Sequence, residues 1–333
     1  MLSSSSTPLC RAYDLAMLDL DGVVYVGPDA VPGAAEHLAS AREQGMGVAF
    51  ITNNASRPPG TVAAHLAELG VPATAADVVT SAQAAAGVLV ERLGEGARVV
   101  LLGTTGLAEA LDERGLVAVG VEDEAEAVVS GYGPEVLWGD IMRAAVRIRD
   151  GLWWVASNTD GTIPTPYGAA PGHGVLVDTV RRFTGVEPTV AGKPARPLLD
   201  ETVRRVGGEH PLMVGDRLDT DIEGARNVGI DSLLVLTGIT GLAELVAARP
   251  GERPSYVGLD LRALTEPQPA PERGDDGWSL GGWAASVRAG ALQVEGGGSA
   301  DDWWRVVAAT AWDALDASGD VVDTAGLTPP SAS

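Results

Sequence analysis

Short apolar segments and amphipathic segments alternate along the first 80 residues. We expect strands at 15–20 and 47–52, which are largely apolar, and helices at 34–44 and 59–69, where apolar residues recur at helical spacing. Gly70, a residue type that commonly ends helices, follows the second helix. Strands separated by helices of about 10–15 residues are typical of βαβ units. The pattern therefore predicts a parallel sheet.

The alternation resumes further along the chain. We expect strands at 98–102, 127–130, 153–157, 211–214 and 232–236, and helices at 106–114, 138–150, 174–185, 198–205 and 220–228. The segment 158–174 contains three prolines and four glycines, so we expect an irregular loop there. We interpret the middle of the chain as an insertion into one α/β domain with a doubly wound parallel sheet.

The pattern changes beyond residue 265. The segment 266–274 is rich in proline, which predicts a linker. Five of the eight tryptophans follow it, at positions 278, 283, 303, 304 and 312. Such aromatic content is not typical of a disordered tail, whereas ~55 residues form only a marginal domain by themselves. We expect this extension to pack on the rest of the protein or on another subunit.

Composition excludes several classes of function. A chain of 333 residues can form two domains with an appendage, and 45 acidic against 23 basic side chains give a net charge of −22. Because such a surface repels phosphate backbones and anionic lipids, we expect neither nucleic acid nor a membrane as a partner. The single cysteine, Cys10, excludes an internal disulfide and a cysteine-built zinc site. Without an apolar run of ~18 residues or a signal-like start, the chain is expected to be cytoplasmic.

Two carboxylates stand at the end of the first predicted strand, in Asp19-Leu20-Asp21-Gly22. The alternation of side chains along a strand sends Asp19 and Asp21 to the same side, beyond the carboxyl edge of the sheet. Paired carboxylates at that edge suit a nucleophile and an acid/base. The alternative is an ordinary turn, since Asp-Gly is a common turn pair.

The second predicted strand ends in Thr52-Asn53-Asn54. A hydroxyl and two amides at a strand end can hold phosphate oxygens, together with main-chain N–H groups. Capping of the loop by these same side chains is the alternative interpretation.

A lone lysine stands in Gly192-Lys193-Pro194, whereas the other 22 basic residues are arginines. An ammonium is a compact point charge with three donors, and a guanidinium is a wide planar fork. A crowded anionic centre would require the ammonium. Chance use of a lysine is the alternative.

Three carboxylates follow the predicted strand at 211–214, at Asp216, Asp219 and Asp221. Their mutual repulsion is costly unless a cation lies among them. Oxygen ligands without His or Cys point to Mg²⁺ over zinc. Alternatively, Asp219 or Asp221 is the N-cap of the next helix.

As a set, the four motifs resemble those of phosphatases of the haloacid dehalogenase-like (HAD) superfamily. They lie in order at or just beyond the carboxyl ends of predicted strands, where open α/β sheets bind their ligands. The resemblance covers residues 11–262 and is to subclass IIA, whose large α/β (C2-type) cap is inserted between the second and third motifs. That subclass includes the 4-nitrophenyl, glycerol-3-phosphate, phosphoglycolate and pyridoxal phosphate phosphatases.

The resemblance implies a division of the chain. It places a Rossmann-like HAD core at 11–82 and 188–264, an inserted α/β cap at 83–187, and a small C-terminal extension at 275–333. The extension resembles the acetyltransferase-like (GNAT-like) segment of some glycerol-3-phosphate phosphatases, through Asp276-Gly277-Trp278 and the later Trp-rich helix. It lacks an acetyl-CoA pyrophosphate loop, so we expect no acetyltransferase activity. Any homo-oligomer is expected to form through the cap or the extension.

The resemblance also assigns roles to the residues of the motifs. Asp19 would be the nucleophile that forms an aspartyl phosphate, and Asp21 the general acid and base. The phosphoryl oxygens would be bound by Thr52, Asn53 and Asn54, while Lys193 neutralises their charge. Mg²⁺ would be held by Asp19, the main-chain carbonyl of Asp21, Asp216 and, directly or through water, Asp221.

The cap is expected to select the substrate, a small phosphorylated metabolite. Asn158 and Asp160 match the cap loop that reaches toward the substrate in the family, although a purely structural role is the alternative. Because 158–174 contains no Lys or Arg, the loop suits hydroxyl groups, and glycerol 3-phosphate is our first choice. The alternatives are a broad-specificity 4-nitrophenyl phosphatase, a phosphoglycolate or pyridoxal phosphate phosphatase, and a non-catalytic binding protein on the HAD scaffold. We interpret His173 as a turn histidine rather than a substrate contact.

Overall fold

The computed structural model describes residues 1–165 and 168–330. Contacts divide the chain into two compact units, one formed by residues 1–48 and 208–333 and the other by residues 49–207. The second unit is therefore inserted into the sequence of the first. The division into core and cap at 83–187 stays a prediction. Among the described residues, no helix is long and apolar enough to span a membrane.

Parallel strands form the centre of the first unit. β1 (Leu15–Leu18) pairs with β13 (Pro211–Gly215), which pairs with β14 (Asp231–Val235), which pairs with β15 (Tyr256–Gly258). The sheet has the order β15-β14-β13-β1-β4-β5, with β4 (Gly47–Thr52) and β5 (Val78–Thr80), and the division between the units passes through β4. The predicted parallel sheet is confirmed.

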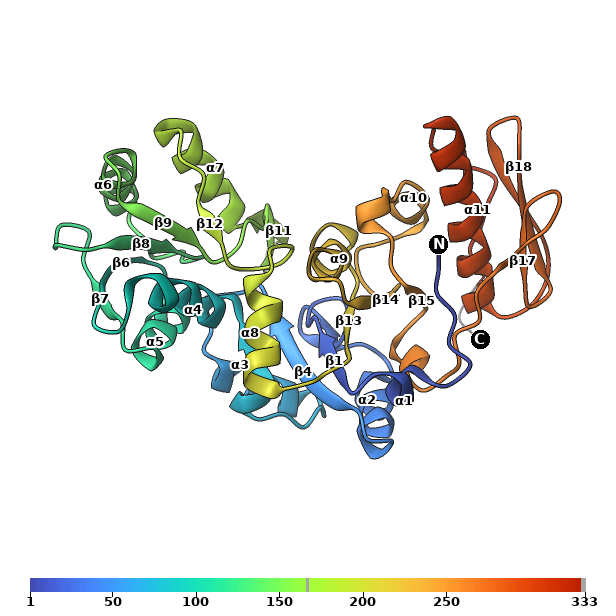
Figure 1. Ribbon diagram of the computed structural model, residues 1–333, viewed down its shortest axis with the longest axis horizontal. Helices are drawn as coiled ribbons and strands as arrows, with labels where there is room; N and C mark the ends of the chain where they lie inside the picture. Colours follow the sequence, from blue (N-terminus) through green and yellow to red (C-terminus); the bar gives the residue numbers. More distant parts are fainter. Residues whose placement is uncertain (166–167, 331–333) are drawn as a thin grey trace. The chain divides into compact units, whose positions relative to one another are not determined.

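Apart from the C-terminal extension, the remaining elements of this unit surround these strands (Figure 1). They are α1 (Leu9–Ala12), β2 (Tyr25–Val26), β3 (Asp29–Ala30), α2 (Ala34–Glu43), a π-type turn η2 (Leu218–Ile222), α9 (Glu223–Val228), α10 (Leu242–Val246), and the 3₁₀ turns η3 (Pro250–Glu252) and η4 (Leu261–Leu264). The side chains of β1 are buried along its whole length, as expected for a strand covered on both faces.

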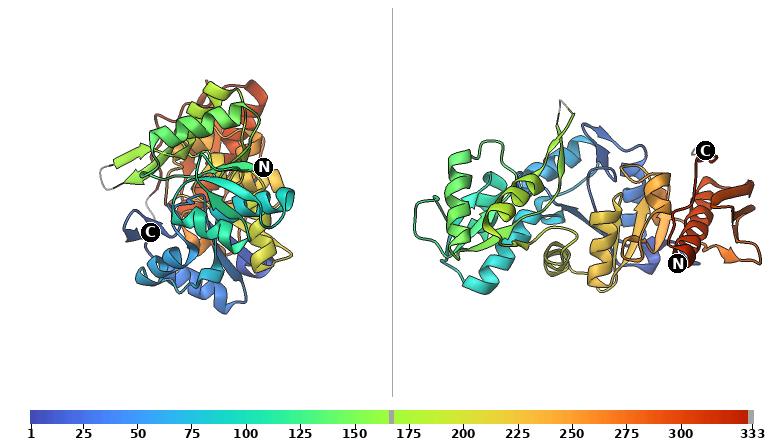
Figure 2. Two further views of the ribbon diagram at one scale, coloured as in Figure 1. Left: turned by 90° about the vertical axis from the view of Figure 1, so that its left-hand side faces the viewer. Right: turned by 90° about the horizontal axis from the view of Figure 1, so that it is seen from above.

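A second parallel sheet lies in the inserted unit, in the order β12-β9-β8-β6-β7. Its strands are β6 (Arg98–Leu102), β7 (Val117–Val119), β8 (Ala127–Ser130), β9 (Trp153–Ala156) and β12 (Thr189–Val190). The helices of this unit are α3 (Pro59–Glu68), α4 (Ser81–Leu93), α5 (Thr105–Glu113), α6 (Trp138–Arg149), α7 (His173–Thr184) and α8 (Pro197–Val206), and a 3₁₀ turn, η1, covers Ala75–Asp77. Figures 1 and 2 show α6 and α7 on one face of the sheet and α4 and α5 on the other.

The segment predicted as an irregular loop contains a β-hairpin instead. β10 (Thr162–Thr165) and β11 (Gly168–Pro171) pair antiparallel, with Pro164 opposite Ala169. In a ribbon of two antiparallel strands, alternate residues direct their N–H groups away from the partner strand, and a proline without an N–H is tolerated at such a position. Counting prolines and glycines therefore led to the wrong prediction for this segment.

The C-terminal extension forms a small sheet and one long helix. β16 (Glu272–Arg273), β17 (Trp278–Leu280), β18 (Trp283–Arg288) and β19 (Ala291–Gly296) pair antiparallel, and α11 (Ala300–Ser318) follows. In Figures 1 and 2, α11 lies between this small sheet and the elements β15 and α10. Trp303, Trp304 and Trp312 belong to one buried cluster with Leu245 and Val257. The expectation that the extension packs on the rest of the protein is confirmed.

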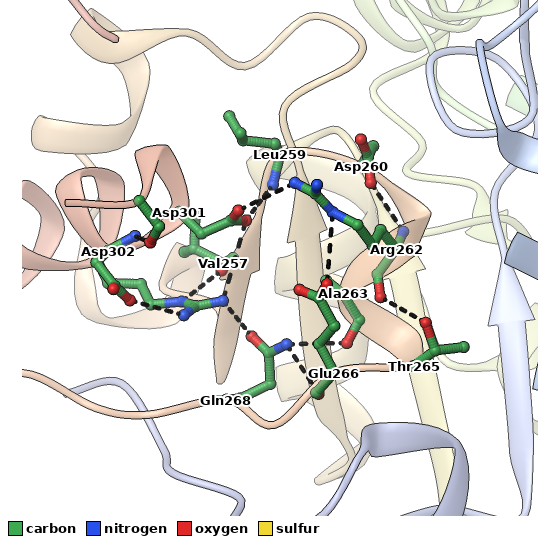
Figure 3. A network of polar contacts seen from close by, with 12 residues as sticks. Val257, Leu259, Asp260, Arg262, Ala263, Thr265, Glu266, Gln268, Asp301 and Asp302 are labelled. Atoms are coloured by element: carbon green, nitrogen blue, oxygen red, sulfur yellow. Dashed lines mark hydrogen bonds and ion pairs between the residues drawn. The ribbon is translucent and has the colours of Figure 1, made fainter. Parts of the chain in front are cut away.

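The segment predicted as a linker is docked rather than free. Gln268 is only 1% exposed, and its main-chain N–H and C=O both pair with Ser5 at 2.8 Å. Its side-chain oxygen accepts a hydrogen bond from the buried guanidinium of Arg305, whose Nε also donates to the carbonyl of Val257. Figure 3 shows Gln268 and Val257 within this network of polar contacts. The composition of 266–274 could not show this, because each partner lies far away in the sequence.

Candidate active site

Two acidic motifs meet at one end of the first unit's sheet. β1 and β13 are parallel neighbours, so the residues that follow them emerge at the same edge. Asp19 extends the pairing, since its N–H donates to the carbonyl of Val214 at 2.9 Å, and Asp216 follows the last residue of β13. Asp21 is exposed at this edge. The predicted placement of Asp19 and Asp216 at strand ends is as the structure has it.

Three carboxylates form a cluster there. Asp19, Asp216 and Asp221 each offer one oxygen, and these oxygens lie within 4.8 Å of one another. Asp19 is half-buried, whereas Asp216 and Asp221 are 1% and 0% exposed. Burying like charges this close together is costly without a cation among them. Three oxygen donors without sulfur or imidazole fit a hard divalent ion such as Mg²⁺ or Ca²⁺.

Three glycines make room for this cluster. A Cβ added to Gly22 or Gly238 would lie 2.4 or 2.0 Å from Oδ2 of Asp216, and one added to Gly215 would lie 2.3 Å from Oδ2 of Asp221. No side chain is tolerated at such distances. Gly22 also has a φ of +82°, a conformation that favours glycine. The backbone around the carboxylates is thus shaped to hold them in place.

The loop after β14 also contributes, which was not predicted from the sequence. The N–H of Ile239 donates to Oδ2 of Asp216 at 2.7 Å, and the hydroxyl of Thr237 donates to the carbonyl of Gly22. These contacts orient the Asp216 carboxylate and join the turn after β1 to the loop after β14. The position of Thr237 and Gly238 just beyond a predicted strand was the signal that could have found them.

The structure separates the three aspartates that follow β13. Arg217 binds Asp219 with both ends of its guanidinium, at 3.0 and 2.8 Å. Burial raises the pKa of Asp219, but this pairing more than offsets it, so the pKa lies below its usual range. Asp221 instead accepts the N–H of Arg217 and joins the cluster. Neither aspartate caps α9, whose N-cap is Ile222, so that alternative is wrong.

The residues after β4 in the second unit are engaged in loop contacts. The N–H of Asn54 donates to the hydroxyl of Thr52 at 3.1 Å, and the side-chain oxygen of Asn54 accepts from both the N–H and the hydroxyl of Ser56. Thr52 and Asn53 are 9% and 8% exposed. The loop-capping interpretation therefore holds for Thr52 and Asn54, whose side-chain oxygens both accept hydrogen bonds from within the loop.

Lys193 is buried, with 2% of its surface exposed. Its main-chain N–H donates to Oδ1 of Asn53 at 2.8 Å, and its carbonyl accepts from Nδ2 of Asn53 at 3.0 Å. Gly192 precedes it because a Cβ there would lie 2.6 Å from Oδ1 of Asn53. The second and third sequence motifs thus meet in the structure, through Asn53 and Lys193.

The cap loop at 158–174 also contacts Asn53. Nδ2 of Asn158 donates to the carbonyl of Asn53 at 2.7 Å, and Oδ1 of Asp160 accepts from Nδ2 of Asn53 at 3.0 Å. Asn158 is 3% exposed, and its side-chain oxygen accepts the N–H of Asp160. Both cap residues therefore have structural contacts with the loop after β4.

His173 is not a turn residue but the first residue of α7. It is 3% exposed, and its Nε2 lies 3.2 Å from the hydroxyl of Ser130, which also accepts from the indole of Trp154. Burial lowers the pKa of the His173 imidazole to about 4. A neutral, enclosed imidazole is part of the core of the second unit, since burial disfavours its charged form.

Two family models match the chain. Residues 16–117 match the haloacid dehalogenase-like hydrolases, and residues 190–264 match the HAD-hydrolase-like model. Together they cover the motifs at Asp19, Thr52, Lys193 and Asp216.

Known phosphatases are similar to this chain over much longer segments than the two family models match. The chain is 43% identical to D-glycerol 3-phosphate phosphatase of Mycobacterium tuberculosis, over 92% of this chain and 88% of that one. A crystal structure of the glycerol phosphate phosphatase of that organism in complex with magnesium has a TM-score of 0.84 and 43% identity, over 92% of each chain. The 4-nitrophenylphosphatase of Thermotoga maritima has a TM-score of 0.71 and 31% identity, over 77% of this chain and 98% of that one. The chain belongs to the haloacid dehalogenase-like hydrolases and is a phosphatase of that family.

Proposed function

We propose that this protein hydrolyses glycerol 3-phosphate to glycerol and inorganic phosphate, with Mg²⁺ as its cofactor. The observation that carries the activity is the largely buried cluster of Asp19, Asp216 and Asp221 at the sheet edge. Such a cluster serves a reaction in which a carboxylate must approach a phosphate dianion, because a cation between them removes the repulsion.

Mg²⁺ would be held by the carboxylates of Asp19 and Asp216 and the main-chain carbonyl of Asp21, with Asp221 binding directly or through water. When bound, the ion neutralises charge on the phosphoryl oxygens. The three glycines around the cluster support this assignment, since a Cβ at Gly22, Gly215 or Gly238 would collide with the carboxylates of Asp216 and Asp221.

Asp19 then acts as the nucleophile. One of its oxygens forms a bond to phosphorus as the bond to the glycerol oxygen breaks, which leaves an aspartyl phosphate. Asp21, protonated at the start, gives its proton to the leaving alkoxide. It later takes a proton from the water that attacks the aspartyl phosphate, which releases phosphate and restores both carboxyl groups.

Thr52 and Lys193 serve the phosphoryl group in this proposal. The hydroxyl of Thr52 and the main-chain N–H of Asn53 donate to its oxygens, because the carboxamide of Asn53 is already engaged by Lys193 and Asp160. The ammonium of Lys193 offsets the negative charge that the phosphate and the nucleophile bring together.

The substrate is inferred from two features. The cap loop at 158–174 holds no Lys or Arg, which suits a polyol phosphate better than a substrate with a second anionic group. Residues 1–269 are about 81% of the chain, so the 92% aligned with the glycerol 3-phosphate phosphatase reaches into the extension. The alignment with the 4-nitrophenylphosphatase covers only 77%. A shared extension favours the glycerol phosphate enzyme as the functional relative.

The test compares kcat/KM for glycerol 3-phosphate, phosphoglycolate and pyridoxal phosphate in the presence of Mg²⁺, by phosphate release. We expect glycerol 3-phosphate to be hydrolysed most efficiently, and Asp19→Asn to set the background rate. A rival substrate turned over ten times more efficiently would overturn the substrate, and activity in Asp19→Asn would overturn the nucleophile.

A further inference from the structure

The carboxamide of Asn53 forms hydrogen bonds with both main-chain polar groups of Lys193, its N–H and its carbonyl. Its oxygen accepts the Lys193 N–H at 2.8 Å, and its nitrogen donates to the Lys193 carbonyl at 3.0 Å. Two hydrogen bonds from one planar group fix the orientation of a peptide segment more tightly than either could alone. The backbone that carries the lysine is thus held by a side chain 140 residues away in the sequence.

Asn53 is itself held in place. Its carbonyl accepts hydrogen bonds from Nδ2 of Asn158, at 2.7 Å, and from the hydroxyl of Ser81. Gly192 leaves space for its side chain, since a Cβ at Gly192 would lie 2.6 Å from Oδ1 of Asn53. The carboxamide therefore has one orientation available, the one that meets Lys193.

Asp160 completes this orientation from the cap loop. Its Oδ1 accepts from Nδ2 of Asn53 at 3.0 Å, and this contact identifies the nitrogen side of the carboxamide. The carbonyl of Asp160 accepts the N–H of Gly174, in the first turn of α7, at 2.8 Å. Gly174 must be glycine, because a Cβ there would lie 2.2 Å from the carbonyl of Thr159. The loop that carries Asp160 is thereby anchored to a helix.

We propose that Asn53 and Asp160 form a positioning pair that sets where Lys193 places its ammonium. The chain of contacts runs from the start of α7 through Asp160 and Asn53 to the backbone of Lys193. A lysine ammonium sits on a flexible stem of four carbons, so fixing the root of the stem reduces the conformational freedom lost in each catalytic cycle. The inference rests on the role proposed above for Lys193.

This assignment differs from a substrate contact by Asp160. If Asp160 bound the substrate's hydroxyl groups, its replacement would lower the turnover of glycerol 3-phosphate but not that of a substrate without alcohol groups. If Asp160 instead positions Lys193, loss of its hydrogen bond to Asn53 lowers the turnover of every substrate equally, because each requires Lys193. Asp160 as a positioning residue also needs only an oxygen that accepts from Asn53, and an asparagine at position 160 supplies one.

The test exchanges the two polar groups. In Asn53→Asp, a second carboxylate faces Asp160 and the donor to the Lys193 carbonyl is lost. In Asp160→Asn, the accepted hydrogen bond survives. In the double variant Asn53→Asp/Asp160→Asn, the new amide at 160 can donate to the new carboxylate at 53. Each protein is assayed with glycerol 3-phosphate and with 4-nitrophenyl phosphate, which has no hydroxyl groups.

We expect Asn53→Asp to lower kcat by at least about tenfold on both substrates, as misplacement of a catalytic group does, with KM changed less. Asp160→Asn is expected to stay within about threefold of the parent, and the double variant to regain part of the lost kcat. Asn227→Asp and Asp178→Asn, on the exposed faces of α9 and α7, make the same chemical changes elsewhere and are expected to be neutral.

A loss confined to glycerol 3-phosphate in Asp160→Asn would overturn the proposal in favour of a substrate contact. Absence of any recovery in the double variant would also overturn it. If Asn53→Asp does not fold by circular dichroism, Asp160→Ala against Asp160→Asn decides, since only the alanine variant should lose kcat on both substrates. Full activity in Lys193→Ala would instead refute the role of Lys193 in the proposed function, whatever the other variants do.

Discussion

Lys193 is the only lysine among 23 basic residues, and the structure buries it with its backbone clamped by Asn53. In the proposed reaction its ammonium offsets negative charge on the phosphate and on the nucleophile. A crowded anionic centre of this kind would favour lysine over arginine at this position. A planar fork needs more room than a point charge.

We therefore expect Lys193→Arg to lose nearly as much kcat as Lys193→Ala, on the order of 10²-fold or more, as when a charge-stabilising donor is removed. Steady-state phosphate release with glycerol 3-phosphate measures the loss. Arg196→Lys, the converse exchange at an exposed position just before α8, serves as the control and should keep its activity. Comparable activity in Lys193→Arg and the parent would make the lone lysine an accident of composition.

At the scale of elements, the loop between β14 and α10 supports the carboxylate cluster of Asp19, Asp216 and Asp221. It brings the N–H of Ile239 to Asp216 and the hydroxyl of Thr237 to the carbonyl of Gly22. The turn η2 holds Leu218 and Ile222 in the same buried cluster as α10 and α11, so the turn that carries Asp221 is anchored in that core. The carboxylates are therefore placed by the packing of several elements.

Gly238→Ala tests this placement. A Cβ at position 238 would lie 2.0 Å from Oδ2 of Asp216, so the carboxylate must move. We expect the affinity for Mg²⁺, measured by isothermal titration calorimetry without substrate, to fall by about tenfold or more, as when the partners of a metal ligand are removed. Gly251→Ala, where nothing lies within 4 Å of the added Cβ, is the matched control. Unchanged Mg²⁺ affinity in Gly238→Ala would remove Asp216 from the site.

At the scale of the whole molecule, the extension belongs to the core of the first unit. Trp312 donates its indole N–H to the carbonyl of Leu245 at 2.7 Å, and Arg253 pairs with Asp316 through both ends of its guanidinium. Arg305 also donates to the carbonyl of Val257, so these contacts join α11 to α10, to β15 and to Arg253. A role of the extension in a homo-oligomer stays a prediction.

Removal of residues 270–333 should expose the apolar surface that Trp303, Trp304 and Trp312 now cover, and lower solubility.

A finer test is Trp312→Ala, expected to reduce the free energy of unfolding by about 3–5 kcal/mol because it leaves a cavity in a packed core. Trp138→Ala, at a side chain 61% exposed on α6, should change it by less than about 0.5 kcal/mol. Equal melting temperatures for the two variants would show that the extension adds no stability.

The sequence by itself determined the fold class and the order of the site motifs. Alternating apolar and amphipathic segments are local, and parallel strands put the residues that follow them at one edge. Asp19 and Asp216 could therefore be assigned to that edge from their positions in the chain alone. A family resemblance on four short motifs supplied the roles.

Tertiary structure decided what depends on distant partners. Arg217 pairs with Asp219, and Asp221 rather than Asp219 joins the carboxylate cluster. Asn53 binds the backbone of Lys193 across 140 residues of sequence. Gln268 pairs with Ser5 through its main chain. Composition and periodicity report the preferences of a segment, whereas the partner of a polar group is set by which segments the folded chain brings together, and no local pattern contains that information.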